Sequence, residues 1–152
     1  MAVEDHPDVQ VFDEIEQIEY LVRNTIRRIL PVGLTYPQYE VLNLLFRRGD
    51  DLSPGEVARA LQLTKSSLTH TLQRLAARKL ARIETSATDG RRKRILLTPE
   101  GRQAYAQTMA AMRPKLEGLR DGFTQKEFRE ALPFLKALRT WLGDKAKGPE
   151  AR

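Results

Sequence analysis

Between residues 53 and 78 the chain reads SPGEVARALQLTKSSLTHTLQRLAAR, which contains two helix starts separated by a short break. Ser53 stands three residues before Glu56, the spacing at which an N-cap side chain and the third helical residue satisfy each other's exposed backbone donors. A second helix is expected from Lys65, after a connection at residues 62–64. Two helices joined by about three residues are typical of a helix-turn-helix.

The second of these helices is predicted to have one apolar side and one polar side. Leu68, Leu72 and Leu75 share a face at helical spacing, and the opposite face is short and polar with cations at its edge. Such a face suits base edges in a major groove, while the cations lie nearer the phosphates. An ordinary amphipathic surface helix is the alternative interpretation. The candidate DNA contacts are Lys65, Ser66, Ser67, Thr69, His70, Gln73 and Arg74.

Residues 80–85 and 92–97 break the helical period and predict two short strands, with Asp89-Gly90 as the turn signal between them. Four consecutive cations occupy positions 91–94, where they can reach a phosphate backbone or a narrow minor groove. Asp89 lies two residues from Arg91 and can orient its guanidinium. The alternative is a solvated strand edge protected against aggregation. The candidate DNA contacts of this hairpin are Asp89, Arg91, Arg92 and Arg94.

Charge is distributed unevenly along the 152 residues, which have a formal net charge of +6. Residues 63–97 hold nine Lys or Arg against two acids, whereas residues 1–22 hold seven acids and no Lys or Arg. One basic face therefore favours a polyanionic partner, with nucleic acid as the first choice and an anionic membrane as the second. No apolar run reaches the roughly 18 residues that span a bilayer, and no secretion signal begins the chain, so a cytoplasmic protein without membrane contact is expected.

The sequence lacks the residue types that several classes of chemical site require. The chain has no cysteine and two histidines, which excludes disulfides, thiolate nucleophiles and iron–sulfur clusters and leaves little for a metal site. No nucleophile–base pair, glycine-rich phosphate loop or paired carboxylate site stands out. We therefore expect neither an enzyme nor a cofactor.

Apolar residues also recur at helical spacing in the outer segments 9–30 and 102–142. Thr98-Pro99 and Thr124 mark further helix starts, and Pro114 and Pro133 are expected to bend or interrupt the last helices. The apolar stripe of the last helix is expected to pack within its subunit and across a two-fold axis. A coiled coil is the alternative, but the heptad spacing is not sustained.

Together these patterns predict a mainly α protein with the order α-α-α-α-β-β-α-α. Residues 35–101 are expected to form a winged helix-turn-helix, residues 1–34 and 102–144 a dimerisation region, and residues 145–152 a flexible tail. A chain of this length has room for one domain with extended arms.

Three stretches carry a resemblance to the MarR family of bacterial winged-helix transcription regulators. The first is LTYPQYEVL at 34–42, and the second is LSPGEVARAL at 52–61 followed by TKSSLT at 64–69. The third, Asp89-Gly-Arg91 leading to LTPEG at 97–101, resembles the family's Asp-x-Arg hairpin and Leu-Thr-x-x-Gly helix start. Two positions depart from the pattern, since Lys79 stands at a usual glycine and Ile83 at a common arginine.

The resemblance implies a homodimer that binds a pseudo-palindromic operator in double-stranded DNA, with a recognition helix at 65–78 and a wing at 86–92. It further implies a small organic effector, often an anionic aromatic compound, that releases the protein from DNA. A repressor is expected, and an activator is the alternative. Arginine pairs with carboxylates, and tyrosine stacks and donates, so the candidate effector contacts are Tyr20, Arg23, Arg27, Tyr36 and Tyr39. Core packing of Tyr39 and solvated arginines are the alternatives at that site. A winged-helix module that binds protein or RNA, using the basic wing non-specifically, is the alternative function.

Overall fold

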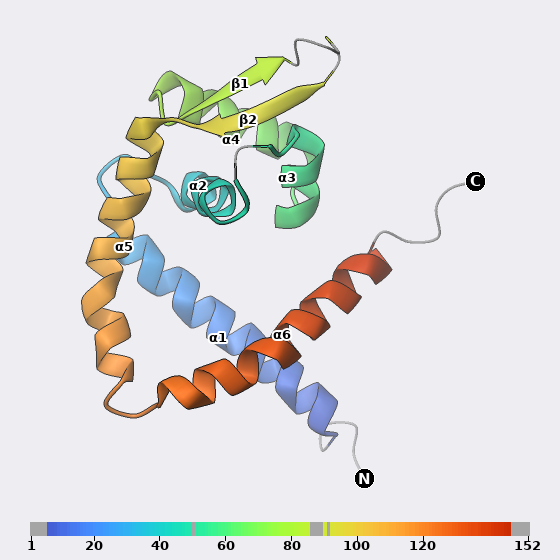
Figure 1. Ribbon diagram of the computed structural model, residues 1–152, viewed down its shortest axis with the longest axis vertical. Coiled ribbons are helices and arrows are strands. Elements are labelled where there is room, and N and C mark those ends of the chain that lie inside the picture. Colours follow the sequence, from blue (N-terminus) through green and yellow to red (C-terminus); the bar gives the residue numbers. More distant parts are fainter. Residues whose placement is uncertain (1–5, 50, 86–89, 91, 147–152) are drawn as a thin grey trace. The chain divides into compact units, whose positions relative to one another are not determined.

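The computed structural model describes residues 6–49, 51–85, 90 and 92–146. It divides into two compact units, the first ending at Met112 and the second starting at Arg113. The predicted order of elements and the mainly helical class are confirmed (Figure 1). The elements are α1 (Pro7–Ile29), α2 (Tyr36–Arg48), α3 (Pro54–Leu61), α4 (Lys65–Ala77), β1 (Ala81–Thr85), β2 (Lys93–Leu97), α5 (Pro99–Leu119) and α6 (Gln125–Ala146).

Reciprocal caps begin α2 and α3 where the sequence predicts them. The Ser53 hydroxyl accepts from the Glu56 amide at 3.1 Å, and the Glu56 carboxylate accepts from the Ser53 amide at 2.9 Å. Thr35 makes the same exchange with Gln38 at 3.4 and 3.3 Å. These bonds satisfy backbone donors that the first helical turn leaves unpaired, so both helices start at a defined residue.

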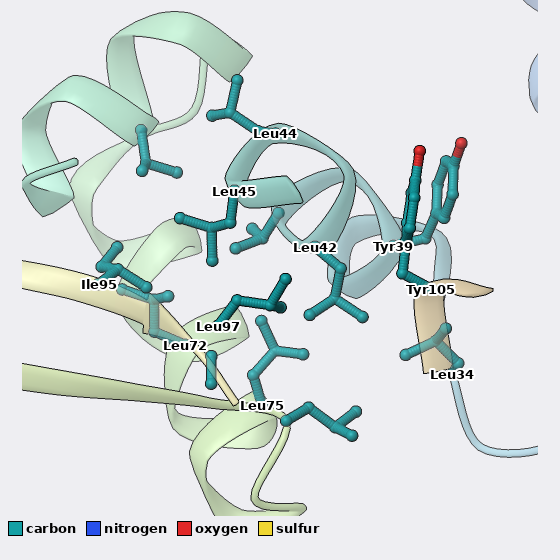
Figure 2. Packing of buried hydrophobic residues seen from close by; sticks show 14 of the residues in the cluster. Leu34, Tyr39, Leu42, Leu44, Leu45, Leu72, Leu75, Ile95, Leu97 and Tyr105 are labelled. Carbon is teal, nitrogen blue, oxygen red and sulfur yellow. The ribbon is translucent and has the colours of Figure 1, made fainter. Parts of the chain in front are cut away.

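The core of the first unit joins α2, α3, α4 and β2 (Figure 2). Val41 and Leu42 from α2, Val57 from α3, Leu75 from α4 and Ile95 from β2 are all 0% exposed. Burying one such aliphatic side chain contributes about 1.5–3 kcal/mol. The five side chains together therefore contribute far more to stability than a single helix cap does. The helix-turn-helix and the hairpin therefore share one rigid core.

The two strands pair antiparallel, with Ala81 opposite Leu97 and Glu84 opposite Arg94. The Ile95 amide also donates to the Leu52 carbonyl at 2.8 Å, so β2 is attached to the segment that leads into α3. Figure 1 shows the hairpin beside α4, and β1 and α4 are in contact. The base of the hairpin is thus held from both sides.

A close backbone contact joins the end of α4 to the start of α5. The Thr98 hydroxyl donates to the Lys79 carbonyl at 2.6 Å and accepts from the Gly101 amide at 2.9 Å. A Cβ atom at Gly101 would lie 2.8 Å from Leu97 Cδ1 and would also collide with the Leu80 carbonyl oxygen. Only glycine allows this approach.

Lys79 takes the left-handed conformation that ends α4, with φ of 59°. The family resemblance places a glycine here, and a residue with a Cβ atom costs roughly 1 kcal/mol more in this conformation. The chain turns at this position without glycine because the Thr98 hydroxyl and the amide of Leu80, which donates to Leu75 at 2.9 Å, hold the backbone in place.

The second unit consists of the end of α5 and the whole of α6. Pro114 and Pro133, which are expected to bend or interrupt the last helices, interrupt neither of them, since both lie inside continuous helices. A proline removes one intrahelical hydrogen bond, and the helix continues on both sides of the gap. α6 reaches Ala146 and so includes two residues that the sequence prediction assigns to the tail. In the described part of the chain, no helix is long and apolar enough to cross a membrane.

We expect Gly101→Ala to destabilise the fold by about 1–3 kcal/mol, the usual range for overpacking, because its methyl group would push apart Leu80 and Leu97. Gly118→Ala is the matched control, because it lies in the same helix with no neighbouring atom within 4 Å of the added Cβ. It should keep or slightly raise stability. Urea unfolding of both variants checks this, and equal midpoints would contradict the close contact.

Candidate nucleic-acid interface

The turn between α3 and α4 has the geometry that the sequence predicts, with α3 ending at Leu61 and α4 starting at Lys65. Gln62 takes the left-handed conformation with φ of 54°, and the Leu63 amide donates back to Ala58 at 2.8 Å. The Thr64 hydroxyl then caps α4 by accepting from the Ser67 amide at 3.1 Å. The turn therefore holds α4 at a fixed angle to α3.

α4 has the buried apolar side and the exposed polar side that the sequence predicts. Leu68, Thr71, Leu72 and Leu75 are buried, and the structure brings the polar candidates together on the exposed surface. The Thr69 hydroxyl donates to the Lys65 carbonyl at 2.8 Å, which leaves its oxygen able only to accept from a partner. The exposed candidates are Lys65, Ser66, Ser67, Thr69, His70, Gln73 and Arg74.

The hairpin adds cations whose arrangement depends on an acid that the sequence analysis did not assign. Glu84 of β1 pairs with Arg94 across the strands at 3.1 Å and with Arg82 on its own strand at 3.2 Å. All three side chains are at least 38% exposed, so the pairs are screened by solvent. Glu84 therefore orients Arg94 along the hairpin, and the strand register is the signal that pairs them.

The remaining candidates of the hairpin region are Asp89, Arg91 and Arg92. Arg92 is exposed next to β2. Asp89 and Arg91 lie outside the described residues, so the proposed Asp-x-Arg site stays a prediction.

Four of the five effector candidates gather on α1 and at the start of α2. The Arg23 guanidinium lies 5.6 Å from the Tyr20 ring centre and 5.8 Å from that of Tyr36, and the Arg27 guanidinium lies 5.4 Å from the Tyr36 ring centre. These are cation–π distances. We call Tyr20, Arg23, Arg27 and Tyr36 the arginine–tyrosine cluster.

Tyr39, the fifth candidate, is 7% exposed and belongs to the hydrophobic core. Its ring stacks on that of Tyr105 with 6.4 Å between centres and lies 5.8 Å from the Tyr36 ring. Tyr39 therefore supports the cluster from the core side.

Two acids accompany the arginine–tyrosine cluster. Glu19 accepts from Arg23 Nε at 2.7 Å, and this hydrogen bond raises the pKa of Arg23 above its ordinary value. Burial raises the pKa of Glu40, which is half-buried, and burial likewise raises the pKa of Tyr36. The i,i+4 spacing from Glu19 to Arg23 could have identified the first acid from the sequence. An anion arriving at Arg23 has to compete with Glu19.

Residues 32–92, which cover the helix-turn-helix and β1 and end just before β2, match the model of the MarR family. A solved MarR-family transcriptional regulator from Silicibacter pomeroyi is 25% identical, with 95% of this chain and 96% of that chain covered at a TM-score of 0.74. The chain therefore matches the MarR family in its helix-turn-helix region and shares its fold with a solved MarR-family regulator. Its winged-helix fold is the one found in these DNA-binding transcriptional regulators.

Two further solved structures are similar to this chain over most of their length. AbfR of Staphylococcus epidermidis is 24% identical, with 90% of this chain and 92% of that chain covered at a TM-score of 0.74. BpsR of Bordetella bronchiseptica is 22% identical, with 84% of this chain and 97% of that chain covered at a TM-score of 0.63. The family resemblance and the fold class predicted from the sequence are confirmed.

We expect alanine at Ser66, His70 or Gln73 to cost roughly 1–3 kcal/mol on the specific site and much less on random duplex, because each can reach base edges if α4 lies in a major groove. Electrophoretic mobility shifts on both duplexes measure this. Gln103→Ala, an exposed substitution on α5, is the control and should leave both affinities unchanged. Equal losses on the two duplexes would show that another face reads the DNA.

Proposed function

We propose that this protein is a homodimeric repressor of the MarR family that binds a pseudo-palindromic operator and is released by a small anionic aromatic compound. One observation carries the proposal. The exposed side of α4 is polar from Lys65 to Arg74, while its opposite side is buried in the core that also holds the hairpin. A rigid helix that presents hydrogen-bonding side chains next to a basic hairpin is suited to reading base edges while cations contact the phosphates.

Exposed apolar side chains on α6 and α1 support the homodimer. Leu132, Leu135 and Leu142 of α6 are 48%, 43% and 44% exposed, and Ile18 and Leu21 of α1 are 54% and 57% exposed. Amphipathic helices with this much exposed apolar surface require a partner. A second copy on a two-fold axis would present two α4 helices to half-sites about one DNA turn apart, which requires an inverted repeat.

The arginine–tyrosine cluster supports an aromatic acid as the effector. Guanidinium groups pair with carboxylates, and the rings of Tyr20 and Tyr36 can stack on an aromatic ligand. DNA binding by the structurally similar BpsR is regulated by 6-hydroxynicotinic acid, which is itself an aromatic acid. A repressor of this kind would act on chromosomal DNA in the cytoplasm.

Selection from a random DNA pool by the full chain should yield an inverted repeat, and sedimentation at micromolar concentration should show a dimer. Leu135→Asp should abolish the dimer, because it places a charge in the apolar stripe of α6. Thr140→Asp on the same helix is the control and should sediment as wild type. If the selection enriches no sequence and the chain binds all duplexes with equal affinity, the protein- or RNA-binding module is favoured instead.

Salicylate and related aromatic acids should raise the melting temperature and weaken operator binding, through a coupling of about 1–3 kcal/mol. Arg23→Met and Arg27→Met should remove both effects, because they remove the cations of the cluster. Arg28→Met, an exposed arginine on the same helix, should keep both effects. If a broad panel shifts neither quantity in the wild type, the effector half of the proposal fails and the DNA-binding half stands.

A further inference from the structure

Arg78 connects the end of α4 to a distant loop. It directly follows α4, and its guanidinium Nη1 donates to the carbonyl oxygen of Gly33, which is 45 residues earlier in the chain. Gly33 lies between α1 and α2 with φ of 83°. A Cβ atom there would lie 3.4–3.5 Å from Nη1, Cζ and Nη2 of Arg78, so the guanidinium rests directly against the glycine.

The side of α4 on which Arg78 lies separates it from the candidate base contacts. Arg78 follows Thr71 by seven residues, about two helical turns, and follows Leu75 by three. Thr71 is 7% exposed and Leu75 is fully buried. The exposed Gln73 lies roughly on the opposite side of the helix. The charge of Arg78 is therefore directed at the protein's own α1–α2 loop.

The loop that receives this hydrogen bond is itself well ordered by neighbouring contacts. The Leu34 amide donates to the Pro31 carbonyl at 3.0 Å, and the Leu34 side chain is 7% exposed in the core. The same loop joins Arg27 of α1 to Tyr36 of α2, two members of the arginine–tyrosine cluster. The backbone just after Arg78 is held from elsewhere, by the Thr98 hydroxyl on the Lys79 carbonyl.

We infer that Arg78 is a positioning residue for DNA recognition. It ties the carboxyl end of α4 to the α1–α2 loop and so sets the orientation in which α4 presents its polar face. It contacts no phosphate. Because the loop also carries the ends of the arginine–tyrosine cluster, this hydrogen bond links the cluster to the orientation of α4. The inference rests on the proposed role of α4 as the helix that reads the DNA.

The test compares Arg78→Met with Arg74→Met on two probes, the duplex that the wild-type chain selects from a random pool and a random-sequence duplex. Arg78→Met should weaken the selected duplex about tenfold, the effect of one lost charged hydrogen bond, and leave the random duplex and the salt dependence unchanged. Arg74→Met should weaken both duplexes and lower the slope of log affinity against log salt by about 1.

Arg78→Lys keeps the charge and covers the case in which Arg78→Met does not fold. A lysine cannot lie flat against Gly33, so it should still weaken the selected duplex alone, whereas a phosphate contact would be preserved by the retained charge. In the DNA-free protein, amide exchange at Leu80 should be faster in Arg78→Met than in Arg74→Met, since the helix end loses its tie.

Two results would overturn the inference. Arg78→Met could lower binding to both duplexes and the salt slope as Arg74→Met does, or Arg78→Met and Arg78→Lys could both bind the selected duplex as wild type does. In both cases Gln73→Ala still tests the proposed function separately. If Gln73→Ala and Arg74→Met also leave the selected duplex unaffected, α4 does not read the DNA and the proposed function fails together with the inference.

Discussion

Burial of one side of α4 is the constraint on which the interface depends. Leu72 and Leu75 are fixed in the same core as Leu42 of α2 and Ile95 of β2, so α4 cannot rotate without exposing them. The cost of exposing even one of these side chains exceeds the energy of a surface contact. The buried leucines of α4 therefore determine which of its side chains face the solvent, and the core keeps those polar side chains in a fixed orientation.

The carboxyl end of α4 is held in place by contacts outside the hydrophobic core. Three contacts meet there: the left-handed turn at Lys79, the hydrogen bond from Thr98, and the close approach of Gly101 to Leu80. They join α4 to the start of α5, while Arg78 joins it to the α1–α2 loop. A helix held at its end by both neighbours can change its orientation only if one of them moves, which is the physical requirement for coupling an effector to DNA binding.

Ion pairs between neighbouring side chains determine the charge available at each site of this chain more than its net charge does. Glu84 holds Arg82 and Arg94, and Glu19 holds Arg23, so acids partly neutralise the cations that a count of charges would assign to DNA or effector. These pairs are exposed and contribute little to stability. Their role is to orient guanidinium groups, and the free energy of any anion that binds there includes the loss of the existing partner.

The sequence by itself determined the local structure and carried the resemblance to the MarR family. Hydroxyl residues three positions before Glu or Gln set the helix starts, the leucine period set the buried side of α4, and the Asp-Gly signal with its flanking strands set the hairpin, because each depends on interactions a few residues apart. Tertiary structure alone decided that Tyr39 packs on Tyr105, that Glu84 pairs with Arg94 across the strands and that Arg78 reaches Gly33. Tyr39–Tyr105 and Arg78–Gly33 join residues tens of positions apart, and the Glu84–Arg94 pair depends on how two strands align. Such contacts follow from how the elements pack, which no local pattern encodes.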